Sequence, residues 1–176
     1  MQEEKVVLVD KFDNQLGLMP KMEAHLKGLL HRAFSVIIFD SRGRILLQKR
    51  ASTKYHTPNL WSNTCCSHQR EGEDNISAGK RRLKEEMGFV TNLYYFDSFI
   101  YKVEFLNGLI EHEKDHILLG VFDGNPIPNQ DEVDEWRWIH IDELVIDVRK
   151  NPESYTAWFR IILDKYSQSL KQWKLQ

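Results

Sequence analysis

The feature that most restricts the fold is one helical segment with β-rich segments on both sides of it. Asp74 or Asn75 can cap the start of this segment, and Gly88 is a natural residue just past its end. We therefore predict a helix from about Asn75 to Met87. Its apolar stripe consists of Ile76, Leu83 and Met87.

The other segments are apolar, rich in β-branched residues and separated by short turns. Residues 33–39 and 44–50 flank the turn at 40–43, which predicts a hairpin. Further strands are expected at residues 6–9, 61–68, 99–105, 109–122 and 132–141, and helices from residue 142 and at about 152–171. Strands around one central helix, with another helix at the end, predict an α/β (α+β) layered domain over residues 1–176.

The composition favours a soluble protein in a reducing, cytoplasmic compartment. The net charge of −2 gives no electrostatic reason to expect nucleic acid or an anionic membrane as a partner. No apolar run approaches the roughly 20 residues of a membrane span, and the first residues lack the layout of a signal peptide. Cys65 and Cys66 are adjacent and so cannot join distant loops. The sequence leaves a monomer and a weak homodimer equally open.

The stretch from Trp61 to His68 places a thiol two residues before an imidazole. In an extended strand Cys66 and His68 share one face with Thr64, and Cys65 points the other way. Such a face holds a possible acid, base or nucleophile and a possible metal ligand. The alternative is a strand with one buried, inert thiol and a surface histidine.

Two other segments offer metal ligands. His25 and His31 can converge only if the chain bends between them, which Gly28 permits; otherwise they are surface histidines. Glu111 and Glu113 alternate onto one strand face, where they repel each other unless water or a cation separates them; otherwise this is an exposed edge. The three histidines and two acids could form one cage for Mn²⁺, Zn²⁺ or a related ion.

A basic cluster follows the strand at 44–50. Arg50 and Lys54 suit an acidic ligand such as phosphate, although most surface charges are simply solvated. Together with Glu86 they suggest a second, harder site, where Mg²⁺ is held by a carboxylate and by ligand phosphates.

Residues 67–89 resemble a degenerate Nudix box, G-x5-E-x7-R-E-U-x-E-E-x-G-U. Ser67 stands in place of the first glycine, and Arg82 replaces the first acid of the R-E pair. Nudix hydrolases need a carboxylate-rich helix to hold metal, so this loss predicts a weakened hydrolase. The matching residues are Glu73, Arg81, Leu83, Glu85, Glu86, Gly88 and Phe89.

The whole chain resembles the type 1 isopentenyl diphosphate isomerases, which have a Nudix fold. The resemblance runs through A-H-x5-H-R-A-F-S, Q-K-R-A-x-x-K, W-S-N-T-C-C-S-H, R-R-L-K-E-E-M-G, Y-x9-E-H-E and T-A-W-F. Members commonly carry a single Cys followed by Gly-His; here Cys66, two residues before His68, is taken as the matching thiol. The implied fold is a single domain of mixed β-sheets sandwiched by helices, with an extra N-terminal region of about 1–32 and a C-terminal helix at about 152–171.

The resemblance also implies an activity: interconversion of isopentenyl and dimethylallyl diphosphate through a tertiary carbocation. Cys66 and Glu113 would be the catalytic pair, and Tyr101 would support Glu113. One divalent ion (Mn, Zn or Mg) would bind His25, His31, His68, Glu111 and Glu113. Glu86 and the Cys66 carbonyl would meet Mg²⁺ on the substrate. The diphosphate would contact Lys21, Arg50, Lys54 and Arg82, and Trp158 would cover the hydrocarbon.

The support of Glu113 by Tyr101 depends on strand register. A two-residue turn at Asn107-Gly108 would pair Tyr101 with position 114 and turn it away from Glu113. We therefore predict an odd-length loop or a bulge that pairs Tyr101 with 113 or 115. Two other functions stay open: a Nudix diphosphohydrolase, and a non-catalytic, metal-stabilised binding module.

Overall fold

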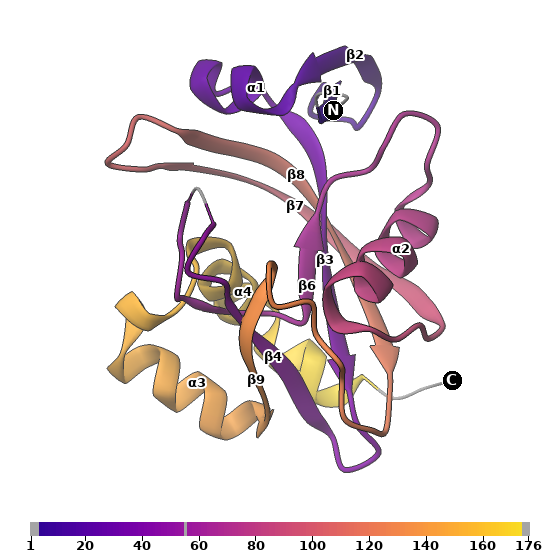
Figure 1. The fold of residues 1–176 in the computed structure, drawn as a ribbon, viewed down its shortest axis with the longest axis vertical. Helices are drawn as coiled ribbons and strands as arrows, with labels where there is room; N and C mark the ends of the chain where they lie inside the picture. Colours follow the sequence, from indigo (N-terminus) through magenta and orange to yellow (C-terminus); the bar gives the residue numbers. More distant parts are fainter. Residues whose placement is uncertain (1–3, 55, 174–176) are drawn as a thin grey trace.

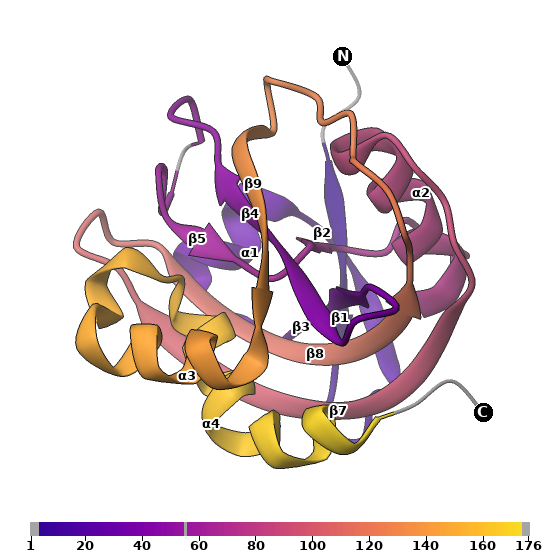
Figure 2. The ribbon, with the colours of Figure 1, turned by 90° about the horizontal axis from the view of Figure 1, so that it is seen from below.

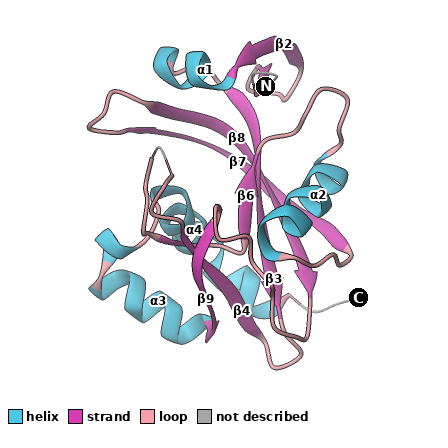
Figure 3. Cartoon of the chain, viewed as in Figure 1, coloured by secondary structure: helices cyan, strands magenta, loops and turns pink. Residues whose placement is uncertain are grey.

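The computed structural model describes residues 4–54 and 56–173 (Figure 1). The first three residues of the expected N-terminal region therefore lie outside the described part. The strands are β1 (Lys5–Val9), β2 (Gln15–Pro20), β3 (His31–Phe39), β4 (Arg44–Arg50), β5 (Trp61–Ser62), β6 (Cys65–Ser67), β7 (Leu93–Glu104), β8 (Ile110–Val121) and β9 (Val133–His140). The helices are α1 (Lys21–Lys27), α2 (Asn75–Met87), α3 (Ile141–Lys150), the short 3-10 helix η1 (Pro152–Ser154) and α4 (Ala157–Gln172), all shown in cyan in Figure 3.

Strand β3 is the centre of one mixed, strongly curled sheet. Along one edge it pairs in parallel with β8 from His31 to Phe39, and the other edge of β8 pairs with antiparallel β7. Along its other edge three strands follow one another: β1 near His31, β6 at residues 34–36 and β4 at Phe39. Because β4 then diverges to pair with β9 and β5, the two parts of the sheet open around the residues between them.

Helices cover both faces of the long strands, as Figure 2 shows for α2 and α4. Ile117 and Leu119 of β8 pack into a cluster that includes α3 and α4, whereas Leu118 packs into a second cluster with α2. A strand buried on both faces is expected to be apolar throughout, as β8 is from residue 117 to 119. The predicted mixed sheet between helices is therefore confirmed.

Helix α2 begins and ends where the sequence predicts. The Asp74 side chain accepts a hydrogen bond from the Ser77 amide at 2.8 Å, which satisfies one free amide of the first turn. Gly88 has a φ of 77° and closes the helix in the left-handed region. Leu83 and Met87 are fully buried, and Ile76 packs against the same cluster.

Two expected elements are shorter than predicted. The hairpin of residues 33–39 and 44–50 is paired only at Phe39 and Ile45, because beyond that point β3 pairs with β6 and β4 pairs with β5. The last helix begins at Ala157 rather than 152. Tyr155 is extended and forms a parallel bridge with Trp61, which interrupts the helical pattern.

Within the described residues, no helix has both the length and the apolar character required to cross a membrane.

Candidate active site

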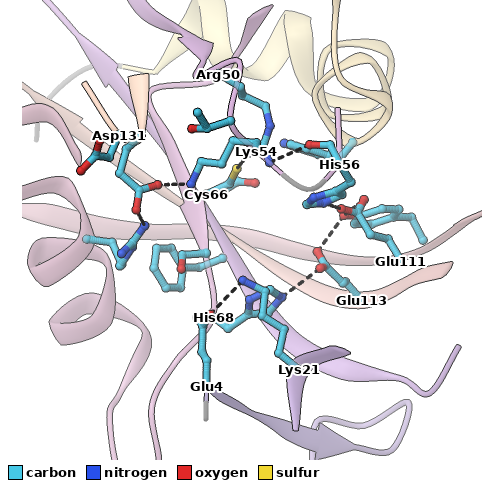
Figure 4. A pocket seen from close by; sticks show the side chains of 18 residues that line it. Glu4, Lys21, Arg50, Lys54, His56, Cys66, His68, Glu111, Glu113 and Asp131 are labelled. Carbon is cyan, nitrogen blue, oxygen red and sulfur yellow. Dashed lines mark hydrogen bonds and ion pairs between the residues drawn. The ribbon is translucent and has the colours of Figure 1, made fainter. Parts of the chain in front are cut away.

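The opening between the two parts of the sheet contains a pocket of about 290 Å³ (Figure 4). One wall carries mostly basic side chains, and another carries histidines and carboxylates. Most of the residues expected at the site meet here, although they come from widely separated parts of the chain. The lining residues are Glu4, Lys21, Phe34, Ser35, Arg50, Thr53, Lys54, His56, Cys66, Ser67, His68, Arg82, Tyr101, Glu111, Glu113, Asp131, Glu132 and Trp158.

Three histidines and one glutamate form a compact group beside the pocket, which two of them, His68 and Glu113, also line. His25, His31, His68 and Glu113 each offer a ligand atom, and these atoms lie within 4.8 Å of one another. The chain bends at Gly28, as the sequence permits: its φ of 61° ends α1 and turns the chain into β3, so the ring centroids of His25 and His31 lie 4.9 Å apart. All four residues are buried, which excludes the alternative of surface histidines.

The hydrogen bonds of this group fit a divalent metal ion. The Nδ1–H groups of His25 and His31 donate to the carbonyls of Lys21 and Leu29, at 2.7 and 2.8 Å. A second hydrogen bond of this kind fixes the tautomer of a metal-binding histidine and leaves Nε2 as the ligand atom. His31 Nε2 is buried with no hydrogen-bond partner and lies 3.4 Å from Glu113 Oε1. This nitrogen and oxygen donor set suits Zn²⁺, Mn²⁺ or a related ion.

Glu113 and Tyr101 lie opposite each other on β8 and β7, in the odd register that we predicted. The connecting loop closes with the Phe105 amide donating to the Leu109 carbonyl at 2.8 Å, which gives the odd spacing. The Tyr101 hydroxyl lies 2.7 Å from Glu113 Oε2 and 3.2 Å from Glu111 Oε2. The prediction that Tyr101 faces Glu113 is therefore confirmed.

Glu111 is buried beside Glu113, so the alternative of an exposed acidic edge is wrong. It stands outside the four-residue group: its Oε1 is 2.5 Å from His56 Nε2. Burial and the neighbouring Glu113 charge raise the pKa of Glu111 well above its usual value. Burial also disfavours the charge on Glu113, but the neighbouring His31 and His68 imidazoles outweigh it and lower the pKa of Glu113.

Cys66 and His68 both line the pocket, and Cys65 is fully buried in the cluster with α2, as the alternating pattern predicts. Thr64 departs from this pattern because its hydroxyl donates to the Leu46 carbonyl at 2.6 Å and anchors the chain between β5 and β6. Burial raises the pKa of the Cys66 thiol to about 12, even though Arg50 lies beside it, with Nη1 4.0 Å from Sγ.

The basic wall is already paired with carboxylates. Lys21 Nζ lies 3.2 Å from Glu4 Oε2, and Arg82 Nη2 lies 3.3 Å from Glu132 Oε1. Lys54 also forms an ion pair with Glu132. Each of these basic side chains lines the pocket, and the carboxylates hold it in position. An anionic ligand could replace those carboxylates as the partner of the basic groups.

Glu86, like His25 and His31, is an expected site residue that does not line the pocket. Its carboxylate is buried behind Arg82, with Oε1 2.7 Å from Arg82 Nη2 and Oε2 accepting from Gln48 Nε2 at 2.9 Å. In this arrangement Glu86 orients Arg82 rather than facing a ligand.

Trp158 closes the pocket from the first turn of α4. Its Nε1–H donates to Asn63 Oδ1 at 3.2 Å, which fixes the ring, and the Arg50 guanidinium carbon lies 5.3 Å from the ring centroid. A fixed aromatic face at this position can attract positive charge.

Sequence reasoning missed several pocket residues. His56 lies in the loop between β4 and β5, where no periodic pattern marks a side chain as buried. Its position two residues after Lys54 was the only available signal. Glu4 and Glu132 were missed because only the fold places them beside Lys21, Lys54 and Arg82.

Comparison with known proteins identifies the class first. Residues 29–159 match the family described as NUDIX domain, so the chain belongs to that family. The fold agrees with solved structures of low sequence identity. DR0079 from Deinococcus radiodurans has a TM-score of 0.76 at 18% identity, over 95% of this chain and 99% of that one. A MutT NUDIX hydrolase from Burkholderia pseudomallei has a TM-score of 0.61 at 22% identity, over 77% and 96%.

Sequence relatives narrow the assignment within that class. The chain is 51% identical to isopentenyl-diphosphate Delta-isomerase 2 of Aromatoleum aromaticum, over 93% of this chain and 86% of that protein. It is 46% identical to isopentenyl-diphosphate Delta-isomerase of Serratia proteamaculans, over 97% and 96%. The chain therefore belongs to the isopentenyl-diphosphate Delta-isomerase family of NUDIX proteins.

Proposed function

We propose that this protein interconverts isopentenyl diphosphate and dimethylallyl diphosphate by adding one proton and removing another. The observation that carries the proposal is the position of Cys66 and Glu113, which line one pocket whose other wall is basic. Moving a double bond by one carbon needs an acid and a base at different carbons of the same substrate. The close relatives that carry this name support the same conclusion.

Glu113, supported by the Tyr101 hydroxyl, is assigned the proton transfer at the terminal methylene. Cys66 is assigned the transfer next to the oxygen-bearing carbon. Protonation of an alkene produces a tertiary cation, and an aromatic face such as Trp158 can stabilise a desolvated cation by about 2 kcal/mol. Because water would trap this cation, enclosure of the substrate is part of the mechanism.

The proposed cofactor is one divalent ion, Mn²⁺, Zn²⁺ or Mg²⁺, held by His25, His31, His68 and Glu113, with Glu111 as a fifth ligand. When bound, it would supply fixed positive charge that holds these carboxylates in place and joins the N-terminal segment to the pocket. The protein residues named above hold and move the protons.

Lys21, Arg50, Lys54 and Arg82 are assigned to the diphosphate, since Arg binds phosphate as a fork and Lys as a point charge. Mg²⁺ bound with the substrate is assigned to Glu86 and the Cys66 carbonyl. This assignment requires Glu86 to release Arg82, which currently lies between Glu86 and the pocket.

Proton NMR in heavy water tests the proposal, with isopentenyl diphosphate, Mg²⁺ and the metal-loaded protein. Dimethylallyl diphosphate carrying deuterium is the expected product. Release of orthophosphate, or formation of isopentenyl monophosphate, would instead indicate a hydrolase. Binding without turnover would indicate a metal-stabilised binding module.

A further inference from the structure

His56 is a pocket residue for which the mechanism above has no role. It lies in the loop between β4 and β5 and is 9% exposed. Its backbone carbonyl accepts a hydrogen bond from Arg50 Nη2 at 3.3 Å, and its ring centroid is 5.6 Å from that of Phe105. These contacts point the imidazole at the carboxylates of β8, as Figure 4 shows for His56 and Glu111.

The Tyr101 hydroxyl has one proton to donate and two carboxylates within hydrogen-bond distance. Its hydroxyl lies 2.7 Å from Glu113 Oε2 and 3.2 Å from Glu111 Oε2. A phenol has a single O–H donor, so it cannot fully satisfy both carboxylates. Glu111 is only 3% exposed, and a buried carboxylate without a donor is costly.

The His56 imidazole lies where it can supply this donor to Glu111. Its Nε2 lies 2.5 Å from Glu111 Oε1, on the opposite carboxylate oxygen from Tyr101. A hydrogen bond at this position would satisfy the Glu111 oxygen that Tyr101 does not reach. If Glu111 accepts a hydrogen bond from His56, the Tyr101 hydroxyl can donate its proton to Glu113 instead.

We propose that His56 is a positioning residue that donates to Glu111 and thereby commits the Tyr101 hydroxyl to Glu113. The chain His56, Glu111, Tyr101, Glu113 thus links the β4–β5 loop, which Arg50 holds, to the carboxylate that is assigned the proton transfer at the terminal methylene. The consequence for turnover rests on the proposed isomerisation, whereas the consequence for Tyr101 is a property of the folded protein alone.

The first test is spectroscopic and uses the full-length, metal-free protein labelled with [¹³Cζ]tyrosine. The Tyr101 resonance is assigned from the spectrum of Tyr101→Phe. We expect it to shift in His56→Ala, because the hydroxyl is then shared between two carboxylates. His56→Gln, which retains a donor, should shift it less, and His140→Ala, at an exposed histidine, should leave it unchanged. A Tyr101 resonance that is the same in His56→Ala and in the unmodified protein would overturn the proposal.

The second test is a double-mutant cycle on turnover. Loss of a residue that orients a site group typically costs about 10–100-fold, so His56→Ala should lower kcat by that factor with KM nearly unchanged. In the Tyr101→Phe background the same substitution should lower kcat less than about threefold, since contacting residues couple. Equal losses in both backgrounds would overturn the role assigned to His56. An unmodified protein that does not isomerise would refute the proposed function instead, and the Tyr101 resonance would still decide the role of His56.

Discussion

Tyr101 and Glu113 are direct cross-strand partners, and the Tyr101 hydroxyl lies 2.7 Å from Glu113 Oε2. This contact exists only because the loop between β7 and β8 has an odd length; one residue fewer would place the tyrosine on the other face of the sheet. The register of a surface hairpin therefore decides whether the Glu113 carboxylate has the Tyr101 hydroxyl as a hydrogen-bond donor.

Removal of that donor should reduce turnover more than stability. In Tyr101→Phe the ring remains in the core, but the hydrogen bond to Glu113 is lost. Bonds to charged groups contribute about 1.5–3 kcal/mol, so we expect kcat to fall by about 10–100-fold. Tyr94→Phe, at an exposed tyrosine of the same strand, serves as the matched control. Equal kcat values for the two variants would contradict the assigned role of Tyr101.

Metal binding should stabilise the fold through the histidine group. Ligand at about 1,000 times its Kd adds about 4 kcal/mol to the free energy of unfolding. We expect Zn²⁺ or Mn²⁺ to raise the urea midpoint of the chelator-treated protein, and His31→Ala to lose most of this increase. His140→Ala should retain it. A midpoint that neither ion changes would show that these residues do not form a metal site.

The role of Gly88 at the end of α2 can be tested by comparison with Gly43, a glycine of similar φ outside the helix. Both have positive φ, 77° and 75°, so a change to alanine strains the backbone in each, by about 1–2 kcal/mol. A Cβ at Gly88 would also lie 2.3 Å from the Ile127 carbonyl oxygen, whereas the space around Gly43 is open. Urea unfolding should therefore show a larger loss for Gly88→Ala, roughly 3 kcal/mol or more. Equal losses of unfolding free energy in the two variants would contradict a steric clash between the new Cβ and the Ile127 carbonyl.

The ion pair of Glu73 and Arg81 should contribute stability that depends on pH. Arg81 holds both carboxylate oxygens, at 2.6 and 2.8 Å, and its hydrogen bonds lower the pKa of Glu73. A carboxyl whose pKa falls on folding stabilises the protein above its unfolded pKa, and this stability is lost as pH falls through the folded pKa. At pH 7 Glu73→Gln should cost about 1 kcal/mol, since the pair is half-buried and partly screened.

Urea midpoints at pH 7 and pH 3 check this expectation. The difference between Glu73→Gln and the unmodified protein should be smaller at pH 3 than at pH 7, and Glu71→Gln, at an exposed neighbour, should show little difference at either pH. A difference of the same size at both values would exclude an ionic origin.

The sequence was sufficient for those features that depend on local physical chemistry. The cap at Asp74 and the left-handed Gly88 define α2 without reference to any other element. The alternation of side chains on one strand places Glu111 and Glu113 together, and Gly28 allows His25 to approach His31. Each of these inferences needs only a short stretch of chain.

Features that depend on partners distant in sequence could not be predicted in this way. The hairpin of β3 and β4 separates after one residue pair because β6 takes the facing edge of β3 and β5 takes the facing edge of β4. Helix α4 starts late because Tyr155 pairs with Trp61. The pairing of Glu86 with Arg82 and Gln48, which turns it away from the pocket, likewise depends on a strand far away in the sequence.

The central claim is that the Cys66 thiol moves a proton in the pocket, and the adjacent Cys65 provides its control. Cys65 is fully buried against α2, whereas Cys66 lines the pocket. The decisive measurement is the rate of dimethylallyl diphosphate formation in heavy water for Cys66→Ala and Cys65→Ala, with metal content and unfolding midpoint recorded for both. We predict that folded, metal-loaded Cys66→Ala forms product at least about 100-fold more slowly than the unmodified protein, as expected for loss of an acid or base, while Cys65→Ala stays within severalfold. Near-normal turnover by Cys66→Ala would contradict the mechanism.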